Sequence, residues 1–147
     1  MTRTSAAHSL SAVLTRPAVG WLALLGLCAA YIQGPLTKLI GFSEAQAEMA
    51  HFGLEPAPLF AAAVILFELV ASAMILTGFY RWLGALGLAG FTLAATLVAL
   101  RFWELPPGFE RTMATNAFFE HLGLAAAFVL VAAQSLRSSP AATDMAS

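Results

Sequence analysis

Six polar side chains stand within or at the ends of long apolar stretches, where they can do chemistry that their neighbours cannot. They are Lys38, Glu68, Arg101, Asn116, Glu120 and His121. A charged side chain at the centre of a bilayer costs about 2.5–3.5 kcal/mol on insertion scales, so such residues usually face protein or water. Carboxyl and imidazole groups in a low-dielectric interior can hold or pass protons. The set predicts a ligand-binding or intramembrane polar cluster, in which no catalytic residue can be assigned.

The histidine in this set does not indicate a metal site. His121 directly follows Glu120, and adjacent helical positions point in different directions. His8 and His51 fall in the N-terminal segment and in a connection. We therefore expect His121 to be a hydrogen-bonded interior histidine, and no metal. The single cysteine, Cys28, excludes an intramolecular disulfide and is expected to be a buried helical residue.

The composition explains why these polar groups need a special environment. Of 147 residues, 60% are hydrophobic and 10% charged, and the mean hydropathy is +0.81. A water-soluble domain carries about a quarter of its residues as charges. The chain therefore needs a bilayer as its solvent. A net charge of −1 without a Lys/Arg cluster argues against a nucleic-acid partner.

Runs of apolar residues predict an all-α membrane protein, an up-down bundle of transmembrane helices. Each run is close to the about 20 residues that cross about 30 Å of hydrocarbon. The four expected helices cover 17–40, 57–80, 82–103 and 113–136. The first could pass for a signal peptide, but its length favours a retained helix. The domain is expected over 17–136, with an N-terminal tail at 1–16 and a disordered C-terminal tail at 137–147.

The connection between the first two runs predicts a short amphipathic helix on the membrane surface. Ser43 and Gln46 have the spacing of a capping box, and Gly53 stands where a C-terminal cap is expected. Apolar residues recur at helical spacing: Phe42, Ala45, Met49 and Phe52.

Small residues suggest which helix faces point inward, because they allow close backbone approach in membranes. The expected inward faces are Gly26–Ala30–Gly34, the Glu68 face, Gly90–Ala94–Leu97–Arg101, and Asn116–Glu120–Gly123–Ala127. Lys38 or Arg101 would then pair with Glu68 or Glu120. Other interpretations stay open: such a pair can serve packing alone, Lys38 and Arg101 can extend to the interface, and Thr92 and Thr96 can bond to their own helix.

Loop charges favour both termini in the cytoplasm. Arg3, Arg16, Arg81 and Arg137 lie on one side, against Lys38, Arg101 and Arg111 on the other. All of the polar set except Glu68 then belongs to the outer half of the membrane, with Glu68 near the midplane.

In this order and spacing, several motifs resemble the DoxX family over about 17–136. They are Gly34-Pro-Leu-Thr-Lys38-Leu-Ile-Gly41-Phe, His51-Phe-Gly-Leu-Glu-Pro-Ala-Pro, Phe67-Glu68-Leu-Val, Leu76-Thr-Gly78-Phe-Tyr-Arg81, Arg101-Phe-Trp-Glu and Asn116-Ala-Phe-Phe-Glu120-His121-Leu-Gly-Leu. The resemblance implies a four-helix bundle associated with respiratory redox functions, since the founding member is a small subunit of an archaeal quinol-linked oxidase. Lys38, Glu68 and Arg81 match the family pattern. Arg101 stands where the family usually has His, and Glu120-His121 stands where it usually has Lys-Asn. The two changes look like a charge swap between helices.

Two kinds of function follow as expectations. The first is an accessory subunit or small-molecule (quinone-like) binding protein linked to membrane redox metabolism, in the cell inner membrane and with a possible redox-complex partner. It predicts a cavity touching Glu68 and His121. The alternative is a small transporter or channel working as a homo-oligomer. The sequence does not decide whether the chain is an enzyme, and its cofactor is unknown beyond the quinone suggested by the resemblance.

Overall fold

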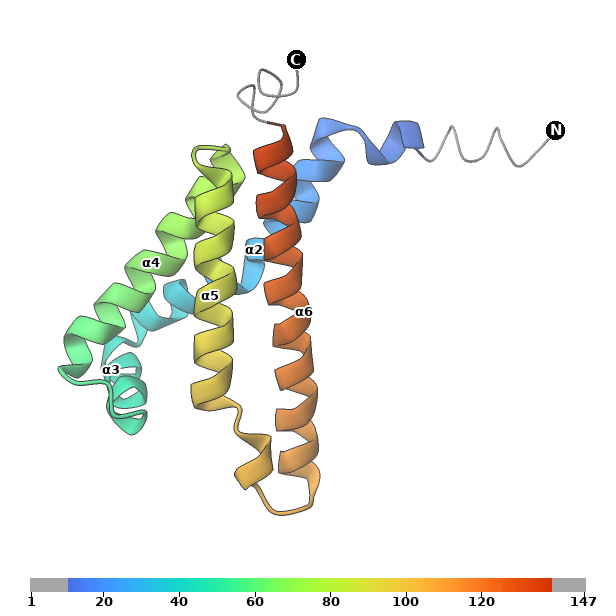
Figure 1. Ribbon diagram of the computed structural model, residues 1–147. Helices are drawn as coiled ribbons and strands as arrows, with labels where there is room; N and C mark the ends of the chain where they lie inside the picture. The colour runs from blue at the N-terminus through green and yellow to red at the C-terminus, as the bar shows by residue number, and fades with distance from the viewer. Residues whose placement is uncertain (1–10, 139–147) are drawn as a thin grey trace.

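Four long helices form the body of the protein, as predicted. The computed structural model describes residues 11–138 (Figure 1). Its elements in chain order are α2 (Pro17–Ile40), α3 (Phe42–His51), α4 (Ala57–Thr77), α5 (Arg81–Ala99), the short 3₁₀ helix η1 (Phe102–Glu104) and α6 (Phe109–Arg137). The described residues contain no strand. Four helices, α2, α4, α5 with η1, and α6, are long and apolar enough to span a membrane, so the chain is a multi-pass membrane protein.

Several helix ends differ from their predicted positions. α4 stops at Thr77, because Gly78 adopts a left-handed φ of 86° and its N–H bonds to the Met74 carbonyl. α5 stops at Ala99 and the chain continues through η1, while α6 begins earlier than predicted, at Phe109. Residues 11–14 of the predicted N-terminal tail are helical. The predictions for 1–10 and 139–147 lie outside the described residues.

The predicted connecting helix is α3, and it is attached to α4. The capping box is wrong: the helix already begins at Phe42, and no side chain caps it. Its end is as predicted, since Gly53 has a φ of 72° and the N–H of Leu54 reaches the Met49 carbonyl. Beside Met49, Ala45 is buried against the start of α4. α3 is therefore part of the packed domain and can position its side chains.

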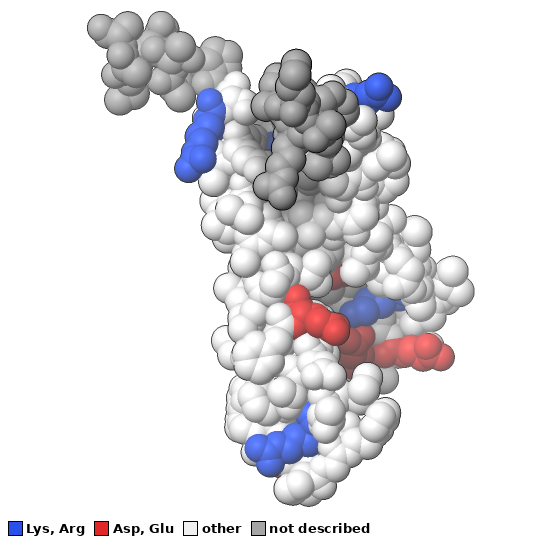
Figure 2. Space-filling view, turned by 90° about the vertical axis from the view of Figure 1, so that its right-hand side faces the viewer, with Lys and Arg blue, Asp and Glu red and all other residues white. Residues whose placement is uncertain are grey.

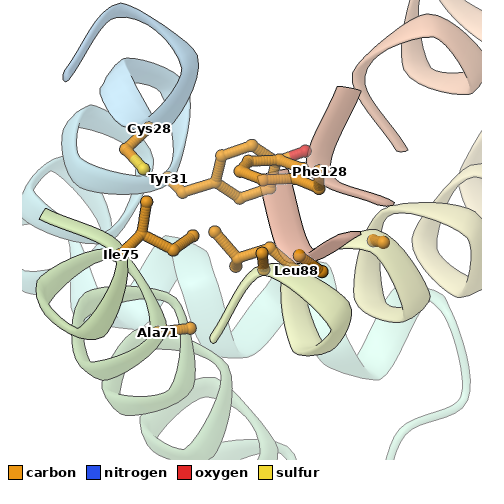
Figure 3. Packing of buried hydrophobic residues seen from close by; sticks show 9 residues of the cluster. Cys28, Tyr31, Ala71, Ile75, Leu88 and Phe128 are labelled. Carbon is orange, nitrogen blue, oxygen red and sulfur yellow. The ribbon is translucent and has the colours of Figure 1, made fainter. Parts of the chain in front are cut away.

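The central core lies where α2, α4, α5 and α6 meet. Its buried members are Cys28, Tyr31, Ala71, Ile75, Ala85, Leu88, Ala89, Phe128 and Ala132. The Tyr31 ring meets the Phe128 ring edge to face, with centroids 5.3 Å apart (Figure 3). Cys28 is fully buried, as predicted. Along the chain, α2 packs on α4, α4 on α5, and α5 on α6.

The predicted inward faces are correct for α4 and wrong for the other three helices. In α2, Gly26 and Ala30 are exposed, while Cys28 and Tyr31 are buried. The exposed residues of α5 include Gly90, Ala94 and Leu97, and those of α6 include Asn116, Glu120 and Gly123. Because these helices are apolar around most of their circumference and lipid is as apolar as leucine, hydrophobicity does not choose a face. Packing of Tyr31, Leu88 and Phe128 chooses it instead.

Candidate functional site

A cluster of three charged side chains lies where α2, α3 and α4 meet. Lys38 Nζ, in the last turn of α2, lies 2.9 Å from Glu48 Oε2 of α3. The predicted partners of Lys38, Glu68 and Glu120, are not its ion-pair partners. Glu48 forms the ion pair with Lys38 instead, because α3 folds back beside the end of α2.

Glu68 is the buried member of this charged cluster. It lies near the middle of α4 with 9% of its surface exposed. Among the described residues, its carboxyl group lies within electrostatic range of Lys38 and Glu48. Among the described residues it has no cation within ion-pairing distance. Glu68 therefore interacts with Lys38 through space, beside a cation already bound by another carboxylate.

A cavity adjoins the charged cluster between α3, α4 and α5. Its volume is about 270 Å³. Its lining residues are Lys38, Glu48, Met49, Phe52, Leu54, Val64, Phe91, Ala94, Ala95, Val98 and Ala99. We call it the α3–α5 pocket. It is apolar except where the Lys38–Glu48 pair forms part of its wall, and neither Glu68 nor His121 lines it, in contrast to the predicted cavity.

A second polar group crosses the interior from α2 to α6. Tyr31 Oη lies 2.5 Å from Thr92 Oγ1, and Thr96 Oγ1 lies 2.9 Å from His121 Nδ1. Each threonine also donates back to its own helix, to the carbonyl groups of Leu88 and Thr92 respectively. The predicted bonding within α5 is confirmed, and the contacts with Tyr31 and His121 add to it.

The structure does not bring the remaining predicted site residues into the interior. Arg101 Nη1 pairs with Glu104 Oε1 at 3.2 Å, and both side chains are about half exposed. Asn116 and Glu120 are exposed on α6. The expected charge swap between Arg101 and Glu120 therefore forms no ion pair. Among residues 11–138, no three side chains of His, Cys, Asp or Glu are grouped to hold a metal ion.

Sequence reasoning missed Glu48 and Tyr31. Glu48 lies in the connecting helix α3, and its pairing with Lys38 depends on how the chain turns at Gly41. Tyr31 follows Ala29 and Ala30 within the first apolar run, so apolarity alone does not distinguish it from its neighbours. A signal for Tyr31 was present in the sequence: a tyrosine well inside a spanning helix needs a hydrogen-bond partner.

The DoxX family model matches residues 13–101, more than half of the chain. The match includes α2 to α5 and ends before η1 and α6, so the resemblance expected over α6 is not part of it. No curated protein and no solved structure matches the chain.

Proposed function

The chain belongs to the DoxX family, and from this membership together with the α3–α5 pocket we propose that it binds a quinone-like molecule within the membrane. The observation that carries the proposal is an apolar cavity whose wall holds one ion pair, Lys38–Glu48, with buried Glu68 nearby. Small-molecule sites are typically apolar, with a few polar groups that fix orientation.

The chemistry of the pocket suits a ring with carbonyl oxygens. The Lys38 ammonium group has three N–H donors and uses at least one for Glu48, which leaves donors for a quinone oxygen. Phe91, Val64 and Val98 supply apolar surface for the ring. The volume of about 270 Å³ is just below the about 300–1,000 Å³ of ordinary ligand sites, and this favours a single-ring head group.

The proposed role is that of an accessory subunit in membrane redox metabolism. The DoxX resemblance implies the redox association, and the pocket supplies a site for the molecule that carries electrons through the bilayer. Deleting the chain in its host should then lower quinol oxidation by membranes, and re-expressing it should restore the rate.

Photolabelling with an azido-ubiquinone of short tail tests binding directly. The purified protein in nanodiscs is illuminated with the probe, and labelled peptides are mapped by mass spectrometry. We expect labelling on α3 and α5, competed by unmodified quinone. Ala95→Phe, which fills the pocket, should abolish the competed labelling, whereas Ala62→Phe on the exposed side of α4 should not.

The control variant separates pocket filling from added bulk. Both substitutions introduce the same side chain into a spanning helix, and only Ala95 lines the pocket. Equal labelling of the Ala95→Phe, Ala62→Phe and parent proteins would refute the α3–α5 pocket as the quinone site.

A further inference from the structure

A second cavity lies at the opposite end of the molecule, between the start of α2 and the end of α6. Its volume is about 750 Å³. Its lining residues are Pro17, Gly20, Trp21, Ala23, Leu24, Leu27, Arg81, Val131, Gln134, Ser135 and Ser138. We call it the α2–α6 cleft. The two helices meet deeper in the core, where Tyr31 contacts Phe128, and diverge toward this end (Figure 1).

The cleft has apolar walls along α2 and at Val131, polar side chains at the end of α6, and one cation. Trp21, Leu24, Leu27 and Val131 supply a hydrocarbon-like surface in helices that span the membrane. Arg81, in the first turn of α5, is half-buried here. A tryptophan near the end of a spanning helix is typical of the region where lipid head groups meet acyl chains.

Arg81 is held in place by a backbone hydrogen bond. Its Nε donates to the Ile75 carbonyl at 2.8 Å, and its Nη2 lies close over Gly78. Within residues 11–138, no carboxylate forms an ion pair with it. The guanidinium group is thus oriented by its Nε bond, and its Nη groups have no ion-pair partner within residues 11–138 and can donate to an anion.

The whole of this end is cationic among the described residues. Arg16, Arg81 and Arg137 lie here, and the described glutamates lie from the middle of the bundle to the other end. On the face shown in Figure 2, red side chains occur only below the middle, whereas blue ones lie both at the upper end and in the lower half. Among residues 11–138, no carboxylate lines the cleft to oppose an anion.

We propose that the α2–α6 cleft binds an anionic glycerophospholipid. Its phosphate accepts hydrogen bonds from the Arg81 guanidinium group, and one acyl chain lies along Trp21, Leu24 and Leu27. Arginine suits this role because its planar donors match phosphate oxygens. Basic pockets between spanning helices are a known form of lipid head-group site. The proposal is independent of the quinone site, which lies at the other end of α5.

Native mass spectrometry of the intact protein, released from detergent with defined lipids, tests the proposal. Phosphatidylglycerol is compared with phosphatidylcholine of the same chains and with glycerol phosphate, which has the anionic group without chains. We expect retained phosphatidylglycerol, weaker phosphatidylcholine and no glycerol phosphate. Equal retention of both lipids would overturn the anionic preference, and binding of glycerol phosphate alone would identify a site for soluble phosphates instead.

Arg81→Gln removes the charge and should weaken phosphatidylglycerol binding about tenfold or more, as expected for the loss of a charge-assisted hydrogen bond. Arg137→Gln is the matched control, because Arg137 is an exposed cation at the same end that does not line the cleft. If both variants weakened phosphatidylglycerol binding equally, the lipid would be held by the general surface charge of this end, and the proposal would be overturned.

Val131→Trp provides an answer even if Arg81→Gln fails to fold. It fills the apolar part of the cleft and keeps every charge, so it should also remove bound phosphatidylglycerol. Quenching of Trp21 by phosphatidylglycerol with brominated acyl chains then locates the lipid. Brominated phosphatidylglycerol should quench tryptophan fluorescence more than brominated phosphatidylcholine does, and Trp21→Phe should abolish this difference. An unchanged difference, or retention of phosphatidylglycerol by Val131→Trp, would place the lipid elsewhere and refute the cleft.

Discussion

Lys38 lies between two carboxyl groups that depend on it to different degrees. Glu48 forms an ion pair with it at 2.9 Å, while Glu68 interacts with it electrostatically from inside α4. The Lys38 side chain is 24% exposed and that of Glu48 is 44% exposed, so water partly screens the pair. Glu68 has no comparable access to water. Removing the cation should therefore be more harmful than removing the buried carboxylate.

Lys38→Met should destabilise the protein by about 1–3 kcal/mol, less than the about 3–5 kcal/mol for breaking a fully buried pair. The reason is that it leaves Glu68 buried beside Glu48 with no cation near either. Equilibrium unfolding in mixed micelles measures this loss. Arg101→Met is the matched control and should change stability by less than about 1 kcal/mol, because the Arg101–Glu104 pair is half exposed. Equal losses in both variants would contradict a special role for Lys38.

Glu68→Gln should leave stability within about 1 kcal/mol of the parent, because the amide keeps the shape of the side chain and no ion pair is broken. Quinone photolabelling should fall, because Glu68 interacts electrostatically with Lys38 in the wall of the α3–α5 pocket. Unfolding in detergent with or without quinone would instead show that Glu68 is a structural residue.

Tyr31→Phe should cost about 1 kcal/mol, because it removes a buried hydrogen bond to Thr92 and keeps the ring that packs on Phe128. Tyr80→Phe is the control: Tyr80 is 56% exposed in the turn before α5, and its loss should be negligible. Thermal unfolding followed by circular dichroism compares them. A Tyr31 variant as stable as the Tyr80 variant would show that the hydroxyl contributes nothing net.

For the helices, the sequence predicted which segments are helical better than it predicted which face of each helix points inward. Length and apolarity alone located α2, α4, α5 and α6. Orientation requires an amphipathic contrast, and most exposed side chains here are as apolar as buried ones: Leu22 and Leu66 are exposed while Leu88 is buried. Glu68 oriented α4 correctly because a carboxylate cannot face lipid cheaply. Glu48 could not be predicted as the partner of Lys38, because that pairing depends on the tertiary position of α3.

Close packing of α4 on α5 can be tested at one glycine. A Cβ at Gly84 would lie 2.8 Å from the Ala71 carbonyl oxygen and 3.0 Å from Met74 Cβ, both on the facing helix. Gly84→Ala should therefore push the helices apart and destabilise by about 1–3 kcal/mol. Gly90→Ala, in the same helix with nothing within 4 Å, should be neutral or slightly stabilising. Similar unfolding midpoints for the two variants would refute this close contact.

The α3–α5 pocket and the α2–α6 cleft differ in the charged residues that lie near them. The α3–α5 pocket lies at the end of the bundle that holds the carboxylates of α3. At the end that holds the α2–α6 cleft, the charged residues among those described are all arginines. The pocket is lined by the last turns of α5 and the cleft by its first residue, so the two lie at opposite ends of one bundle (Figure 1). The orientation of the chain therefore decides which leaflet supplies each ligand.

Accessibility of single cysteines determines that orientation. With four spans, the start of α2 and the end of α6 lie on one side, and we predict that this side is cytoplasmic. In a Cys28→Ala background, Ser43→Cys on α3 and Ser138→Cys after α6 each add one exposed thiol at opposite ends. A membrane-impermeant maleimide should label intact spheroplasts at position 43, and position 138 only after permeabilisation. The reverse pattern would invert the topology and assign the arginine-lined cleft to the outer leaflet, where the α3–α5 pocket is now expected.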